Sequence, residues 1–273
     1  MINSPLAIIA GQGNLPLKII AEQKKHRPIV ILAIEGQTPT SIVDTTNNEF
    51  PILWTKFGLV AAALSFFKQH NVKDIVMAGG MTRPKMRDLS VDWVGTRWVS
   101  ALGINAFKGD DHLLKALIGL FEKEGYNVVP AHNLVSNLFA DEGVLTKTTP
   151  TKADLADLFH GKSILDLLSP YDVGQAIVVH DGCVLGIETI GGTEALLSHV
   201  KDLGRTQGGV FIKMPKRGQS QQADVPTIGI QTIRQVHNAG LSGIAIESAG
   251  VQILDLEQVM QLADELNLFI IGF

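Results

Sequence analysis

Apolar and polar residues alternate along the first 130 residues in a way that predicts strands and helices in turn. Short continuous apolar runs at residues 6–10, 28–34 and 74–78 are typical of strands that are buried on both faces. Apolar residues at helical spacing predict helices from Leu17 onward and over residues 59–67 and 112–123. Strand–helix alternation of this kind favours a parallel sheet with helices on both faces, so we expect a doubly wound α/β first domain.

The pattern changes after Pro130, where a polar segment bracketed by prolines is typical of a connection. We place the boundary near His132, which gives domains 1–132 and 133–273. In the second domain, apolar runs at 175–180 and 183–188 are joined by Asp181-Gly182, a strong signal for a β-hairpin. Further strands are expected at 209–213, 243–247 and 252–254, and helices at 193–203, 232–239 and 256–266.

Composition limits the classes of protein that these domains represent. The chain has 273 residues, of which 45% are hydrophobic and 18% charged, so it can bury a core without disulfides. A net charge of −4 without a long basic run excludes nucleic acid as an expected partner. Cys183 is the one cysteine, and the N-terminus lacks the features of a signal peptide, so we expect a cytoplasmic protein. The longest apolar run, residues 57–67, is too short to cross a bilayer. Contact with a membrane surface does not require a spanning segment and stays open.

A glycine-rich loop follows the first predicted strand. Gly11, Gly13 and Asn14 lead into a helix N-terminus, where free backbone N–H groups and the helix dipole favour phosphate. Glu35 ends the next strand, where a dinucleotide-binding domain keeps its ribose-binding acid, but Pro16 replaces the third glycine of that fingerprint. A structural turn, a nucleotide contact and an NAD(P)-linked oxidoreductase all remain open on this loop alone.

Other polar residues follow the ends of predicted strands. Gly79 and Arg83 lie just after the strand at 74–78, at the edge of a parallel sheet where ligands usually bind. In the second domain the candidates are Asp172, Gln175, Glu188, Thr193, Glu194, Lys213, Gln219 and Asp224. Carboxylates gathered with lysines and amides suit a divalent cation and a phosphorylated substrate, while a solvated surface loop is the plainer alternative.

Taken together, these motifs resemble the LpxI family, the UDP-2,3-diacylglucosamine pyrophosphatases of lipid A biosynthesis. The resemblance runs nearly from end to end and keeps the order and spacing of the family. The motifs that carry it are Ile9-Ala-Gly-Gln-Gly-Asn-Leu-Pro16, Ala78-Gly79 with Arg83, Asp172-Val-Gly-Gln-Ala176, Glu188, Gly192-Thr193, Lys213, Gln219 and Asp224-Val-Pro-Thr-Ile-Gly229.

The resemblance implies a Rossmann-like N-terminal domain and a distinct α/β C-terminal catalytic domain that enclose the substrate between them. It implies Mg²⁺-dependent hydrolysis of the pyrophosphate bond of UDP-2,3-diacylglucosamine to UMP and lipid X, the 2,3-diacylglucosamine 1-phosphate. A homodimer is implied, and a peripheral contact with the inner membrane is an expectation. Because water must attack a phosphorus surrounded by anionic oxygens, neutralisation of charge and alignment would supply most of the catalysis.

Roles carried over from the family fall on the matching residues. Asp224 would bind Mg²⁺ or orient water, with Glu188, Glu194 and Asp172 as further metal ligands. Lys213 and Gln219 would hold phosphate oxygens as catalytic residues. The substrate-binding candidates are Gly11, Gly13, Asn14, Gly79, Arg83, Gln175 and Thr193.

The sequence departs from the family in two of these motifs. The family's Glu-Gly-Thr-Asp is Gly191-Gly192-Thr193-Glu194 here, and the arginine five residues after that acid is His199. The family's Gln-Asp is Gln219-Ser220. Replacing Asp by Glu moves a carboxylate by about 1 Å, enough to disturb a metal site or an attack geometry. A homologue that binds a UDP-sugar or an acylated ligand without turnover is therefore the alternative to an active pyrophosphatase.

Overall fold

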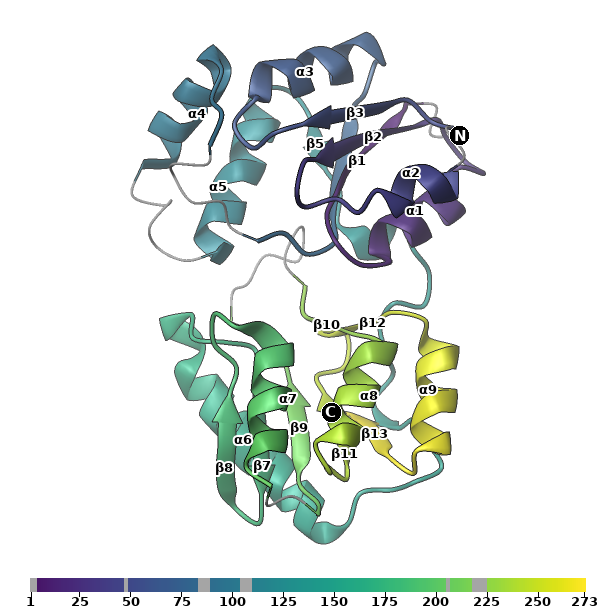
Figure 1. The fold of residues 1–273 in the computed structure, drawn as a ribbon, viewed down its shortest axis with the longest axis vertical. Helices are drawn as coiled ribbons and strands as arrows, with labels where there is room; N and C mark the ends of the chain where they lie inside the picture. The colour runs from purple at the N-terminus through teal and green to yellow at the C-terminus, as the bar shows by residue number, and fades with distance from the viewer. Residues whose placement is uncertain (1–3, 47–48, 83–88, 104–109, 205–206, 218–224) are drawn as a thin grey trace. The chain divides into compact units, whose positions relative to one another are not determined.

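The computed structural model describes residues 4–46, 49–82, 89–103, 110–204, 207–217 and 225–273 (Figure 1). These residues form two compact units, one reaching to Ser136 and the other beginning at Asn137. The predicted fold class is confirmed, since each unit is built on a sheet with helices packed against it. No helix among the described residues is both long and apolar enough to span a membrane.

The first unit contains a five-stranded sheet in the order β3-β2-β1-β4-β5, with every neighbouring pair parallel. β1 and β2 are buried along their whole length, as their continuous apolar runs predict. The strands are β1 (Leu6–Ala10), β2 (Ile29–Ile34), β3 (Ile52–Thr55), β4 (Asp74–Ala78) and β5 (Asn127–Val128). The strand order reverses between β1 and β4, so the loops after these two strands lie at the switch point of the sheet.

Helices cover both faces of this sheet (Figure 1). They are α1 (Leu15–Gln23), α2 (Ser41–Thr46), α3 (Val60–Gln69), α4 (Trp93–Leu102) and α5 (Asp110–Lys123). Residues of α3, α4 and α5, including Phe67, Trp98 and Phe121, share one hydrophobic cluster with Ala7 and Ile9 of β1. In β1, Ile8 lies between Ala7 and Ile9, and its side chain points to the opposite face of the sheet, because side chains alternate along a strand.

The second unit contains a six-stranded mixed sheet in the order β6-β13-β11-β9-β7-β8. β9, β11 and β13 are parallel, whereas β7 is antiparallel to both β9 and β8. The strands are β6 (Gly143–Val144), β7 (Ala176–His180), β8 (Cys183–Ile187), β9 (Val210–Lys213), β11 (Gly243–Ile246) and β13 (Phe269–Gly272). The predicted hairpin is confirmed, since β7 and β8 are joined by Asp181 (φ +49°) and Gly182 (φ +73°), both left-handed.

Helices of the second unit pack on opposite faces of this sheet. α7 (Gly192–Asp202), α8 (Ile230–Asn238) and α9 (Leu256–Glu265) share one hydrophobic core with it. On the other face, Leu158 and Leu165 of α6 (Lys152–Leu168) pack against Ile177, Val179 and Ile212. A short parallel pair, β10 (Thr227–Ile228) and β12 (Gln252–Ile253), and the 3-10 turns η3 (Ala131–Asn133) and η4 (Ser169–Tyr171) complete the described elements.

Candidate functional site

Four of the predicted site residues meet near the ends of β8 and β9. Glu188 follows β8, and its two carboxylate oxygens accept hydrogen bonds from the Gln175 backbone N–H at 3.0 Å and the Thr193 hydroxyl at 2.7 Å. Lys213 ends β9, and its Nζ donates to the Thr193 hydroxyl at 2.9 Å and to the Thr227 carbonyl at 3.1 Å. Thr193 therefore joins the carboxylate to the ammonium group, and we call Gln175, Glu188, Thr193 and Lys213 the Lys213 network.

The two charged residues of this network are buried. Glu188 is 8% exposed and Lys213 is 6% exposed. A buried charge is tolerated only when hydrogen bonds and an opposite charge compensate for the water it has lost. For Lys213, Thr193 and Thr227 accept the hydrogen bonds, and Glu188, which is bonded to the same Thr193 hydroxyl, supplies the opposite charge, so the ammonium group is held in a defined position. Sequence analysis identified all four members of this network as site residues, but not Thr227, whose backbone carbonyl accepts a hydrogen bond from Lys213.

Two of the other predicted metal ligands lie beside the network in sequence, Asp172 three residues before Gln175 and Glu194 next to Thr193. Asp172, which has left-handed backbone geometry (φ +55°), forms an ion pair with Lys216, and both side chains are largely buried. Glu194 is exposed in the first turn of α7. In the part of the chain that the structure describes, no three His, Cys, Asp or Glu side chains are grouped as a metal site.

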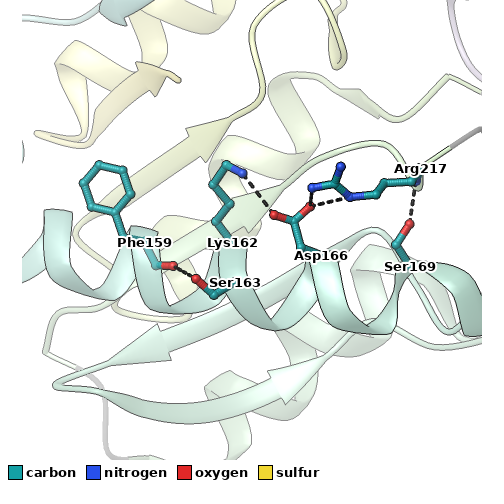
Figure 2. Close-up of polar contacts among 6 residues, drawn as sticks. All are labelled: Phe159, Lys162, Ser163, Asp166, Ser169 and Arg217. Carbon is teal, nitrogen blue, oxygen red and sulfur yellow. Dashed lines mark hydrogen bonds and ion pairs between the residues drawn. The ribbon is translucent and has the colours of Figure 1, made fainter.

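A second polar cluster, which sequence analysis missed, ties α6 to the segment after β9 (Figure 2). Asp166 accepts hydrogen bonds from Arg217 Nε at 3.1 Å and Nη2 at 2.7 Å, and from Lys162 Nζ at 3.1 Å. The Arg217 backbone N–H also donates to the Ser169 hydroxyl at 2.5 Å. These bonds hold Arg217, which follows β9, against the C-terminal end of α6 and the adjoining η4.

The electrostatics of this cluster extend to Glu247, which follows β11. Burial raises the pKa of Glu247; the charges of Lys162 and Arg217 oppose the rise and that of Asp166 adds to it. For Asp166, burial favours a higher pKa, but the hydrogen bonds and charges of Lys162 and Arg217 outweigh it and hold the pKa below its ordinary value. Glu247 was detectable in principle, because it ends the strand predicted at 243–247, as Lys213 ends the strand predicted at 209–213.

Replacing Asp166 with asparagine is expected to lower the free energy of unfolding by up to about 1 kcal/mol at pH 7, since exposed Arg217 limits the worth of the pair. The lowered pKa means that the contribution is complete above about pH 4, the ordinary pKa region, and is lost as the pH falls through the folded-state value. Urea unfolding of the protein and of Asp166→Asn between pH 7 and pH 3 checks this. A difference between the two that grows toward low pH would contradict it.

In the first unit, the loops after β1 and β4 are joined backbone to backbone. The Gly11 N–H donates to the Ala78 carbonyl at 2.7 Å, and Gln12 and Gly80 exchange hydrogen bonds of 2.8 and 3.1 Å. A Cβ atom at Gly11 would lie 2.5 Å from the Gly80 carbonyl oxygen, and one at Gly79 would meet the Gln12 carbonyl. Glycine at both positions is therefore required for this close approach of the loops.

The rest of the glycine loop is open to solvent. Gly13 has φ +85° with no atom within 4 Å of a Cβ built on it, and Asn14 is exposed at the start of α1. Glu35 is half-exposed, and its Oε2 atom lies 3.8 Å from Lys56 Nζ. At this switch point the structure brings Gly11 and Gly79 into contact, while Arg83 lies outside the described residues.

The segment that carries Gln219, Ser220 and Asp224 also lies outside the described residues. Of the other departures from the family, Gly191 precedes α7 and His199 is exposed on it. Neither residue belongs to the Lys213 network.

Comparison with known proteins covers both units. The family model described as the LpxI N-terminal domain matches residues 5–138, and that of the LpxI C-terminal domain matches residues 141–271. The chain is similar to a protein of Caulobacter vibrioides named UDP-2,3-diacylglucosamine pyrophosphatase LpxI. The two are 31% identical over 275 residues, which cover 98% of this chain and 96% of the relative.

Proposed function

The chain belongs to the LpxI family, and we propose that it is a hydrolase that cleaves the pyrophosphate bond of UDP-2,3-diacylglucosamine in lipid A synthesis. The products would be UMP and 2,3-diacylglucosamine 1-phosphate. The name of the Caulobacter relative supports the reaction, and the Lys213 network is the observation in this molecule that carries it.

Hydrolysis of a pyrophosphate builds negative charge on the phosphoryl oxygens and on the leaving group. A fixed cation stabilises that charge without reorganising during the reaction, which is worth more in a site that excludes water. Lys213 is such a cation, because Thr193 and Thr227 hold its Nζ in place and the side chain is buried. Glu188 acts through Thr193, so in this proposal it positions the hydroxyl that orients Lys213.

Mg²⁺ is proposed as the cofactor. Mg²⁺ is usually bound by one or two carboxylates together with phosphate oxygens and water, so a cluster of three protein ligands is not required. Glu188 fits as one ligand, since the two hydrogen bonds named above use one lone pair on each of its oxygens. Asp224 would be the second ligand. When bound, the ion would neutralise charge on the phosphate oxygens.

The test is release of UMP from UDP-2,3-diacylglucosamine by the purified protein, first with Mg²⁺ and then with EDTA. We expect UMP and an equal amount of lipid phosphate with Mg²⁺, and loss of both with EDTA. Equal rates in the two conditions would contradict the Mg²⁺ proposal. Folded protein that binds the substrate without releasing UMP would contradict the hydrolase and favour a binding protein, the function that the departures at Gly191, Glu194 and Ser220 suggest.

A further inference from the structure

α6 presents two different faces. Leu158, Gly161 and Leu165 are buried on the face that packs on β7 and β9. Gly161 allows a close approach, because a Cβ atom there would lie 2.8 Å from the Ile212 Cδ1 atom. The sheet therefore fixes which residues of α6 point away from it.

The opposite face of α6 is unusually apolar for a surface. Its exposed residues are Lys152, Ala153, Ala156, Phe159, His160, Ser163 and Leu167. With 3.6 residues per turn, they occupy an arc of about 120°. Phe159 is 61% exposed and Leu167 is 74% exposed, and Tyr171, in the adjoining η4, is 77% exposed. We call the surface formed by these exposed residues of α6 and by Tyr171 the α6 outer face.

Charge on the α6 outer face has one sign. Lys152 carries its formal charge at pH 7, and none of the exposed residues of α6 is acidic. The acids of the helix are occupied elsewhere. Asp154 forms a capping box with Thr151, Asp157 accepts the backbone N–H groups of Asp181 and Gly182, and Asp166 binds Lys162 and Arg217.

We propose that the α6 outer face docks on the surface of an anionic lipid bilayer. A helix that lies in a membrane interface combines large apolar side chains with basic residues, and its affinity rises with anionic lipid. A face that carries Lys152 and no acid complements a negative surface, and Phe159, Leu167 and Tyr171 would enter the headgroup region. The inference rests on the proposed function in one respect: a substrate with two acyl chains resides in a bilayer, so an enzyme that docks there meets it.

The binding test uses the full chain and two kinds of vesicle. One is an equal mixture of phosphatidylglycerol and phosphatidylcholine, and the other is phosphatidylcholine alone. In sedimentation with vesicles we expect stronger binding to the mixture. The triple variant Phe159→Ser, Leu167→Ser, Tyr171→Ser should lower partitioning at least about tenfold, since its apolar contacts are lost. Lys152→Glu should lower binding to the anionic vesicles several-fold and leave binding to phosphatidylcholine unchanged.

The matched control is Trp93→Ser, which removes a 69% exposed aromatic side chain from α4 in the other unit. This variant should bind the vesicles as strongly as the unaltered protein does. Equal losses in the control and the triple variant would overturn the assignment to α6, as would absence of vesicle binding by the unaltered protein. Sedimentation equilibrium adds a further check: a dimer that the triple variant converts to a monomer would identify the face as an interface between copies and overturn the proposal.

Turnover separates this inference from the proposed function. The triple variant should release UMP at an unchanged rate from substrate dispersed in detergent, and show a raised KM for substrate embedded in the anionic vesicles. An unchanged KM in vesicles would contradict docking by this face. If the unaltered protein releases no UMP in either form, the proposed function fails, while the vesicle-binding measurement still decides the docking surface.

Discussion

Replacing Lys213 with methionine is expected to lower kcat for UMP release by about 10²–10³-fold, the usual effect of removing one preorganised group that stabilises transition-state charge. Methionine keeps the apolar stem of the side chain, so packing around β9 is largely preserved. What is lost is the ammonium group that donates to Thr193 and Thr227. The measurement is UMP release at saturating substrate and Mg²⁺.

The same change should also destabilise the fold. Without Lys213, Glu188 is a buried carboxylate with less compensation, and the Thr227 carbonyl loses a donor. We expect the free energy of unfolding to fall by about 1–3 kcal/mol, measured in urea. The matched control is Lys201→Met, an exposed lysine of α7, which should change neither quantity measurably. A folded Lys213→Met protein with normal kcat would remove Lys213 from the proposed site.

The sequence pattern predicted those elements whose residues all favour the same secondary structure. β1 and β2 are continuous apolar runs, and both were found in the center of a parallel sheet. The β7–β8 hairpin was predicted from Asp181-Gly182, since few other residue pairs adopt two left-handed conformations in succession. In these cases local chemistry and tertiary packing favour the same conformation.

α6 shows why other elements were not predicted. Asp154, Asp157 and Gly161 interrupt the buried side of this helix, so the apolar stripe that marks an amphipathic helix is broken. The two acids are buried because they bind backbone N–H groups, and glycine is there because the sheet is close. For Asp157 and Gly161 the cause is a contact with another part of the fold. A start signal was nevertheless present, since Thr151 and Asp154 form a capping box.

β3 and β13 were missed for a different reason. Each has only four residues, Ile52–Thr55 and Phe269–Gly272, and lacks the glycines that mark the start of the equally short β9 and β11. For the site, the residues that end strands could be predicted, and Lys213 and Glu188 are joined in the structure through Thr193. The Arg217–Asp166 contact could not, because the two residues are 51 positions apart and no spacing rule connects them.

Replacing Asp224 with alanine is expected to reduce UMP release by at least about 10³-fold while the protein stays folded, since charge neutralisation at the phosphates supplies most of the catalysis. Of the two acids that the family has in this segment, Asp224 is kept here and the other is replaced by Ser220. Circular dichroism and urea unfolding establish that the variant is folded. The matched control is Gln222→Ala, a polar residue of the same segment, which should keep normal turnover.

Asp224→Asn distinguishes two roles for this carboxylate, because asparagine keeps the shape of the side chain and removes its charge. If Asp224 holds Mg²⁺, the Mg²⁺ concentration for half-maximal UMP release should rise at least about tenfold, since Mg²⁺ binds charged oxygen ligands more tightly than amides. If it orients the attacking water, kcat should fall with an unchanged Mg²⁺ requirement. Normal turnover in folded Asp224→Ala would contradict both roles and shift the catalytic assignment toward Glu188 and Lys213, which the structure already brings together through Thr193.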